Sequence, residues 1–304
     1  VHALNGISFT LGENETLGLV GESGCGKSTA GRTLLRLLAP TSGTVKFKGQ
    51  DIFALSEPAM KAVRRQMQII FQDPFGSLNP RLTVENIVAE PLLTHRIGDA
   101  VQRRQKVREA LDMVGLLPEH MQRFPHEFSG GQRQRIMIAR TLILRPSVII
   151  ADEPVSALDV SVQAQVINLL TRLQDQLGFS YIVISHDLGV VRYISHRVAV
   201  MYLGEIVELA PVQTLYSTPL HPYTRSLLSA VPVPNPRVKK KRIILEGDVP
   251  SPIHPPSGCK FHPRCPERMA ICQKETPVVR ELPGGHRVAC HLCKEGLNGD
   301  NAHP

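Results

Sequence analysis

Residues 21–28 have the types and the spacing of a loop that binds phosphate. They read Gly-Glu-Ser-Gly-Cys-Gly-Lys-Ser and match the pattern G-x-x-x-x-G-K-[ST]. Glycines let the backbone curl so that successive N–H groups face one anion, and a following helix directs its positive end to the same place. Lys27 can then reach the β- and γ-phosphates of a nucleotide, and the Ser28 hydroxyl can bind Mg²⁺. The octet predicts a nucleoside-triphosphate site, against the alternative of a chance glycine-rich turn. The residues expected to contact nucleotide here are Gly21, Glu22, Ser23, Gly24, Cys25, Gly26, Lys27, Ser28 and Thr29.

Polar residues suited to hydrolysis follow three apolar runs. Asp152 and Glu153 end the run 148–151, which is typical of a buried parallel strand. We expect Asp152 to hold Mg²⁺ through water and Glu153 to act as general base towards the attacking water, with turn capping as the alternative for Glu153. His186 follows a β-rich run and is predicted to orient the γ-phosphate and Glu153. Gln72 follows the run 67–71 and is predicted to contact Mg²⁺ and the attacking water.

A second helix start with the character of an anion site lies far along the chain. It reads Ser129-Gly130-Gly131-Gln132 and precedes the helical pattern of residues 136–144. One chain cannot easily close this start and the loop 21–28 around the same nucleotide.

The elements that must position these residues alternate between strands and helices. Such alternation predicts an α/β protein with a mostly parallel sheet. The stretch from about 75 to 145 is rich in helix formers and predicts an inserted helical subdomain. Beyond about residue 210 prolines accumulate, so we expect a loop-rich tail with one helix at 224–230. The expected strands are 4–20 (in short pieces), 44–47, 68–71, 148–151, 182–185 and 198–202.

Length, charge and hydropathy limit the partners. The chain has 304 residues, a formal charge of +8 and no apolar window of spanning length, so we expect membrane contact only through partner proteins. Its first residues resemble neither a signal peptide nor a methionine start, and we expect a few upstream residues to be missing. The basic run 239–242 is interpreted as a solvated connector, with a lipid contact as the alternative. No basic face with interleaved aromatic residues supports nucleic-acid binding.

Five of the six cysteines lie between residues 259 and 293. Such clustering indicates a local metal site more than a chain-wide disulfide framework. Cys259, Cys265, Cys272 and Cys290 have the spacing C-x5-C-x6-C-x17-C, and Cys293 follows. With His262, His286 and His291 nearby, these residues favour Zn²⁺, although four thiolates also suit a [4Fe–4S] cluster. The sixth cysteine, Cys25, lies in the anion-binding loop, where we expect a lowered thiol pKa, raised reactivity and protection by ATP.

Taken in their order along the chain, the loop 21–28, Gln72, the segment 129–132, Asp152-Glu153 and His186 resemble the motifs of the ATP-binding-cassette ATPases over residues 1–210. The resemblance implies a P-loop NTPase fold: a RecA-like, mostly parallel sheet with an antiparallel β subdomain and an inserted helical subdomain. It also implies a head-to-tail dimer, in which Ser129 and Gly131 of one subunit cap the γ-phosphate bound by the loop of the other, with Gly130 and Gln132 in the same segment. Asp159 would then lie at the dimer seam, and the segment 73–80 would carry motion to membrane subunits. The aromatic residue on which this family stacks adenine would precede Val1.

Residues 219–236 and 249–266 resemble the C-terminal extension of the ATP-binding subunits of bacterial dipeptide and oligopeptide importers, a branch that includes nickel importers. The resemblance implies two transmembrane permease subunits, an extracytoplasmic binding protein and a place on the cytoplasmic face of the inner membrane. It favours a [4Fe–4S] cluster over Zn²⁺ at the four cysteines. The domains expected are a nucleotide-binding domain at 1–215 and an extension at 216–304. Nickel or another solute as cargo, a soluble cassette ATPase and a redox-sensing subunit remain alternatives.

Overall fold

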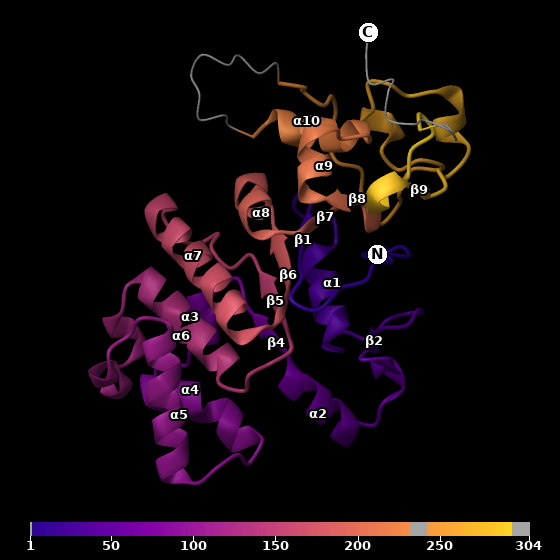
Figure 1. Cartoon of the computed structure of the whole chain (residues 1–304). Coiled ribbons are helices and arrows are strands. Elements are labelled where there is room, and N and C mark those ends of the chain that lie inside the picture. Colours follow the sequence, from indigo (N-terminus) through magenta and orange to yellow (C-terminus); the bar gives the residue numbers. More distant parts are fainter. Residues whose placement is uncertain (1, 232–241, 294–304) are drawn as a thin grey trace. The chain divides into compact units, whose positions relative to one another are not determined.

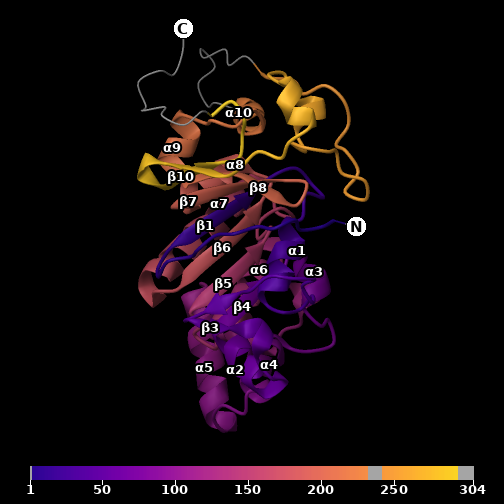
Figure 2. The same cartoon turned by 90° about the vertical axis from the view of Figure 1, so that its right-hand side faces the viewer.

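The computed structural model describes residues 2–231 and 242–293, which form two compact units (Figures 1 and 2). The first unit comprises residues 1–10, 17–30 and 186–304, and the second comprises residues 11–16 and 31–185. Both combine strands with helices, which confirms the α/β class. Three lysines of the predicted basic connector, Lys239 to Lys241, lie outside the described residues. None of the helices described has both the length and the apolar character needed to cross a bilayer.

The sheet of the first unit begins with a fully buried strand. This strand, β1 (Thr16–Val20), pairs in parallel with β7 (Arg197–Tyr202). On the other side of β7, β8 (Glu205–Pro211) is antiparallel and β10 (His286–Val288) pairs with it, as Figure 2 shows. Strand β9 (Arg280–Leu282) pairs with β10 and extends the antiparallel part. The residues of β1 are buried throughout, as expected for a parallel strand covered on both faces.

Short helices complete the first unit. Helix α1 (Lys27–Leu34) follows the phosphate loop, with residues 27–30 in the first unit and 31–34 in the second, and α8 (Leu188–Ile194) precedes β7. After β8 come α9 (Val212–Ser217) and α10 (Pro222–Ser229). The cysteine-rich segment holds only single turns before and after β9: η4 (His262–Arg264), η5 (Ala270–Gln273) and η6 (Pro283–Gly285).

The proline-rich tail differs from the sequence prediction in one respect. Helix α10 lies close to the expected helix, but the tail also contributes to an apolar core. Phe261, Cys259 and Cys272 are buried in one cluster with Tyr202 of β7 and Tyr223 of α10. The sequence did not predict this shared core, which forms because the tail packs on apolar residues of β7 and β8.

Three parallel strands form the centre of the second unit. Strand β5 (Val148–Asp152) lies between β4 (Met67–Ile70) and β6 (Ser180–Ser185). Helix α7 (Val160–Leu177) connects β5 to β6, which is the helical crossover that a parallel pair requires. A short antiparallel pair lies earlier in the chain, followed by a turn and a helix; these elements are β2 (Lys46–Phe47), β3 (Gln50–Asp51), η1 (Ile52–Ala54) and α2 (Glu57–Gln66).

Residues 75–145 of the second unit contain helices and the turns between them, and no strand. Helices α4 (Val84–Thr94), α5 (Ala100–Met113) and α6 (Gly130–Leu142) pack against one another (Figure 1). Their apolar stripes meet, and their inward residues Val88, Val107 and Ile138 are completely buried. The remaining elements are α3 (Pro74–Ser77), η2 (Pro118–Gln122) and η3 (Pro125–Glu127).

The first residues of the chain form fewer strands than expected. Of the predicted short strands in 4–20, only Thr16–Val20 forms a strand. Nearer the N-terminus, the Asn5 N–H donates to the Gly204 carbonyl at 2.8 Å, a single bond and not a ladder. Alternating hydrophobicity identifies a half-buried extended chain, but a strand also needs a partner along its length.

Candidate nucleotide-binding site

The loop 21–28 connects β1 to α1 and has a backbone that glycine permits. Gly21 and Gly26 have φ angles of 153° and 106°. A Cβ atom on Gly21 would lie 2.2 Å from the Met201 carbonyl oxygen, and one on Gly26 would lie 2.3 Å from the Ala3 carbonyl oxygen. These two positions therefore need glycine both for conformation and for close backbone approach.

Lys27 places a positive charge inside this loop. Its side-chain ammonium donates to the carbonyl oxygens of Gly21 at 2.8 Å and Glu22 at 3.0 Å, and the residue is 6% exposed. Ser28 follows in the first turn of α1. The arrangement has the two features of an anion site, a fixed cation and a helix start.

Cys25 does not have the chemistry that the sequence suggested. The residue is 4% exposed, and burial raises the pKa of its thiol, an effect that exceeds the lowering by Lys27. The expected lowering of the thiol pKa was wrong, because desolvation of a buried thiol disfavours the charged form. Cys25 instead contributes a backbone contact: the Gly204 N–H donates to its carbonyl oxygen at 2.9 Å.

Two of the predicted hydrolytic residues meet in the second unit. The Gln72 side-chain amide, after β4, donates to a Glu153 carboxylate oxygen at 2.8 Å. Glu153 has a φ of 49°, and its N–H donates to the Ile184 carbonyl of β6 at 2.9 Å. Asp152 ends β5 and is 3% exposed. A non-glycine residue in the left-handed region is uncommon. Here that residue is Glu153, which comes directly after the last residue of β5, Asp152.

The segment at residues 129–132 forms a helix start closed by its own side chains. The Ser129 hydroxyl accepts from the Gln132 N–H at 3.3 Å, and the Gln132 side chain accepts from the Ser129 N–H at 3.0 Å. These reciprocal bonds make a capping box for α6. A Cβ atom on Gly131 would lie 2.4 Å from a Val162 methyl of α7, so Gly131 has a packing reason besides any role with phosphate.

The two remaining candidates lie at element ends. Asp159 caps α7 by accepting from the Val162 N–H at 3.0 Å, and this bond is the main cause of its lowered pKa. Asp159 is exposed. His186 directly follows β6 in the chain, is exposed, and belongs to the first unit.

The extension contacts the phosphate loop, and the residue pattern along the chain does not predict this contact. The Tyr223 hydroxyl accepts from the Glu22 N–H at 2.9 Å, across 201 positions of the chain. The Arg264 guanidinium forms two bonds with the Glu22 carboxylate, at 2.7 and 3.1 Å, across 242 positions. Glu22, predicted to contact nucleotide, thus has its carboxylate bound by the extension.

The cysteines of the extension lie near one another. The Cys259 thiol interacts electrostatically with Cys265, Cys272 and Cys290, and burial raises its pKa and that of Cys265 to about 11. All cysteines are unpaired thiols. In the residues described, however, no three potential ligands are placed to hold a metal ion, so the predicted metal site finds no support there.

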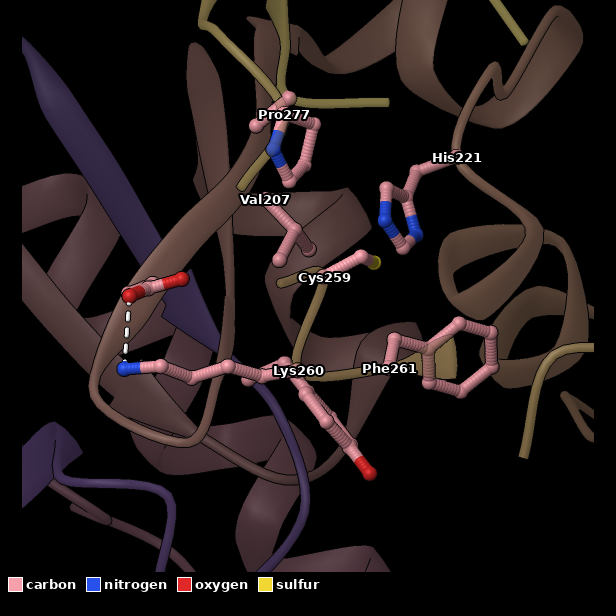
Figure 3. A pocket seen from close by; sticks show the side chains of 9 residues that line it. Val207, His221, Cys259, Lys260, Phe261 and Pro277 are labelled. Atoms are coloured by element: carbon pink, nitrogen blue, oxygen red, sulfur yellow. Dashed lines mark ion pairs between the residues drawn. The ribbon is translucent and has the colours of Figure 1, made fainter. Parts of the chain in front are cut away.

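The predicted histidine ligands have other partners. His262 and His291 are hydrogen-bonded to the carbonyl oxygens of Cys259 and Glu275, each at 2.9 Å, and His286 is paired with Glu208 at 2.7 Å. Beside Cys259, a cavity of about 20 Å³ has room for roughly one water molecule. Val207, His221, Phe261 and Pro277 contribute to its walls (Figure 3).

Comparison with known proteins agrees with this arrangement. Residues 4–156 match the family model described as ABC transporter, and residues 207–272 match that of the oligopeptide/dipeptide transporter C-terminal region. The chain is 58% identical to the oligopeptide transport ATP-binding protein AppF of Bacillus subtilis over 96% of its length and 90% of the relative. It is 54% identical to the probable peptide ABC transporter ATP-binding protein y4tS of Sinorhizobium fredii, over 96% of this chain and 83% of the relative.

Solved structures resemble the cassette part. The ATP-binding cassette MJ0796, solved as a dimer in a post-hydrolysis state with ADP and Pi, aligns with a TM-score of 0.63 and 31% identity, covering 69% of this chain and 90% of that one. Clostridium perfringens cbiO1, part of an ABC transporter complex, aligns with a TM-score of 0.65 and 29% identity, covering 71% and 84%. The phosphate loop, the paired carboxylates and these matches together show that the chain belongs to the ABC transporter family of ATPases, a P-loop NTPase with the oligopeptide/dipeptide transporter C-terminal region.

Proposed function

We propose that this protein hydrolyses ATP to power the import of dipeptides or oligopeptides. The observation that carries the hydrolytic part is the Gln72–Glu153 hydrogen bond of 2.8 Å, which holds a carboxylate at the end of β5 beside the buried Asp152. The peptide part is supported by the matched C-terminal region and by the names of relatives that align over nearly the whole chain.

In the proposed reaction, a water oxygen bonds to the γ-phosphorus while the bond from that phosphorus to the β,γ-bridging oxygen breaks. Glu153 takes a proton from this water, Gln72 orients Glu153 and the water, and His186 orients the γ-phosphate. Residues 21–29 bind the phosphates, with Lys27 on the β- and γ-oxygens. Ser28, Gln72 and Asp152 offer the oxygen ligands that Mg²⁺ prefers, and the ion would neutralise phosphate charge.

A second ATPase subunit completes each site in this proposal. Ser129, Gly130, Gly131 and Gln132 of one subunit meet the γ-phosphate held by the other subunit, and Asp159 lies at the seam. The dimeric MJ0796 cassette supports this pairing. The exposed position of Asp159 at the start of α7 leaves its side chain available for such a contact.

The proposed setting is the cytoplasmic face of a bacterial inner membrane. Two permease subunits would bind the cassette through the segment 73–80, and an extracytoplasmic protein would deliver the solute. Residues 1–215 would form the nucleotide-binding domain, with a helical subdomain at about 75–145, and residues 216–304 the extension. Nickel or another solute is the second candidate for the cargo, and a soluble cassette ATPase the alternative role.

The cysteine cluster is proposed to hold a [4Fe–4S] cluster, with Zn²⁺ as the alternative. The spacing of Cys259, Cys265, Cys272 and Cys290 along the chain is the basis of this proposal, whereas the ligand placement in the described residues does not support it. Anaerobic purification, metal analysis and absorption at about 400 nm show whether the cysteines hold iron, zinc or no metal. Iron with that absorption supports the cluster, and protein without bound metal refutes both forms.

The test of function is transport by the complex purified from membranes with its associated subunits. In proteoliposomes, ATP-dependent uptake of a labelled tripeptide is expected, and uptake of labelled Ni²⁺ is not. A Glu153→Gln complex is the matched control, because it keeps the side-chain size and loses the base. Peptide uptake equal in both complexes, or uptake of Ni²⁺ alone, would refute the proposal.

A further inference from the structure

Every polar group of Glu22, the second residue of the phosphate loop, has a partner. Its N–H donates to the Tyr223 hydroxyl at 2.9 Å, and its carbonyl oxygen accepts from the Lys27 ammonium at 3.0 Å. Its carboxylate accepts hydrogen bonds from both terminal nitrogens of Arg264, at 2.7 and 3.1 Å. Two of these three partners belong to the C-terminal extension, so the extension holds this residue from outside the loop.

The contact with Arg264 differs from an ordinary surface ion pair. The Arg264 side chain is 9% exposed and that of Glu22 is 28% exposed, so solvent screens the pair only partly. The two parallel bonds fix the carboxylate in direction as well as in distance. Hydrogen bonding to Glu22 is also the main cause of the raised pKa of Arg264. Removing one partner would leave a mostly buried charge without compensation.

Arg264 is itself held in place by the extension's core. It ends the single turn η4, and its N–H donates to the Phe261 carbonyl at 3.0 Å. The Phe261 ring, 1% exposed, packs edge-on against Tyr202 with 5.2 Å between ring centroids, and lies 5.4 Å from the Tyr223 ring. Figure 3 shows Phe261 next to Lys260 and Cys259 in this segment. The two groups that bind Glu22 thus rest on one aromatic cluster.

These contacts reach the residue that carries the loop's positive charge. Lys27 donates to the carbonyl of Glu22, and the Cys25 N–H donates to the same carbonyl at 3.3 Å. A shift of Glu22 would therefore move acceptors that place Lys27 and the turn at Cys25. A contact that only fastened the extension to the cassette would have no such consequence.

We propose that Arg264 is a positioning residue for the phosphate loop: by binding Glu22, the C-terminal extension sets the affinity of the loop for the triphosphate. This inference rests on the proposed ATPase function and adds a role for the extension within it. Tyr223 supports the same residue through the Glu22 N–H.

The test compares two arginine variants with a matched control from the same segment. Arg264→Gln removes the charge, and Arg264→Lys keeps it without the fork. The control is Lys260→Gln, because Lys260 is also partly buried and its ion pair, at 2.7 Å with Glu205 of β8, includes no residue of the loop. KM and kcat for MgATP are measured on the assembled complex, and binding of a fluorescent ATP analogue is measured on the full chain.

For Arg264→Gln we expect KM and the analogue's Kd to rise about 5- to 30-fold, with kcat within about 2-fold of the parent. Arg264→Lys should recover part of the loss, and Lys260→Gln should behave as the parent. Glu22→Gln should reproduce the effect, and the double variant Glu22→Gln/Arg264→Gln should lose no more than either single one, because both remove one interaction.

Equal KM values for Arg264→Gln and Lys260→Gln would overturn the proposal, even if Arg264→Gln melted at a lower temperature. If Arg264→Gln does not fold, Tyr223→Phe decides, since it removes only the hydroxyl that accepts from Glu22; an unchanged KM there refutes the inference. Lys27→Ala distinguishes failure of the proposed ATPase function from failure of the inference about Arg264. If that variant hydrolyses ATP like the parent, the proposed function fails, whatever Arg264 does.

Discussion

The two glycines that begin α6 make a matched pair for testing packing against phosphate contact. A Cβ on Gly131 would lie 2.4 Å from the Val162 methyl of α7, whereas one on Gly130 would meet Leu158 at an ordinary 3.4 Å. Overpacking costs about 1–3 kcal/mol. Alanine in place of glycine in a helix returns about 0.5–1 kcal/mol. We therefore expect Gly131→Ala to lower the free energy of unfolding by about 1 kcal/mol, and Gly130→Ala to leave it equal or slightly higher.

The assay is a double-mutant cycle in urea unfolding with Val162→Ala, which removes the obstructing methyl groups. The coupling energy between Gly131→Ala and Val162→Ala should be about 1–3 kcal/mol, with the double variant more stable than the sum of the single effects predicts. A coupling energy near zero would refute the packing argument. ATPase activity of the same four complexes adds a second readout: turnover restored in the double variant indicates packing, and turnover still lost indicates that the new methyl group blocks phosphate.

Three further predictions concern buried ionisable groups. Burial lowers the pKa of His221 to about 4, below its unfolded value of about 6.5. The unfolded chain therefore binds more protons in between, so stability should fall by up to about 3 kcal/mol as pH drops from about 6.5 to 4. His221→Asn, which keeps an acceptor at the start of α10, should flatten that profile in urea unfolding, and an unchanged profile contradicts the assignment. Glu208 is completely buried and accepts from the N–H groups of Leu220 and His221 as well as from His286. Its change to Ala should cost about 3–5 kcal/mol of unfolding free energy by denaturant titration, and Glu205→Ala, at the more exposed pair with Lys260, should cost less; similar losses in both would be contrary evidence. Finally, N-ethylmaleimide should label Cys25 at least about 10-fold more slowly in the native protein than in urea, measured by mass spectrometry; equal rates would show that burial does not protect the thiol.

The sequence predicted the parts of the site that depend on short spacing. Residues 21–28 form one loop, and Asp152 and Glu153 end a strand, because local chain geometry follows directly from neighbouring residue types. The hydrophobic runs also placed β4, β5, β6 and β7 to within two residues at each end. Burial against distant segments cannot be predicted from short spacing along the chain. Such burial raises the pKa of Cys25, opposite to the direction expected from the sequence.

The same limit explains what was missed in the tail. Tyr223 and Arg264 belong to the two tail segments that resemble the importer extension, and nothing in their sequence neighbourhood indicates a partner more than 200 positions earlier. The buried Glu208 lies in β8, a strand that the hydrophobic runs did not predict. Its carboxylate is hydrogen-bonded to three groups, one on β10 and two in the turn before α10, which only the folded chain brings together. Prolines correctly indicated loops there, but not that those loops would share a core with β7 and β8.

The central claim is that one triphosphate is held by the loop 21–28 of one subunit and the helix start 129–132 of another. Its most direct test is sedimentation of the Glu153→Gln protein, alone and mixed with its partner ATPase subunit, with and without MgATP. We predict that MgATP produces a two-subunit species, and that adding Ser129→Arg abolishes this species while ATP binding to the loop persists. A two-subunit species that survives Ser129→Arg, or none in either mixture, would contradict the account.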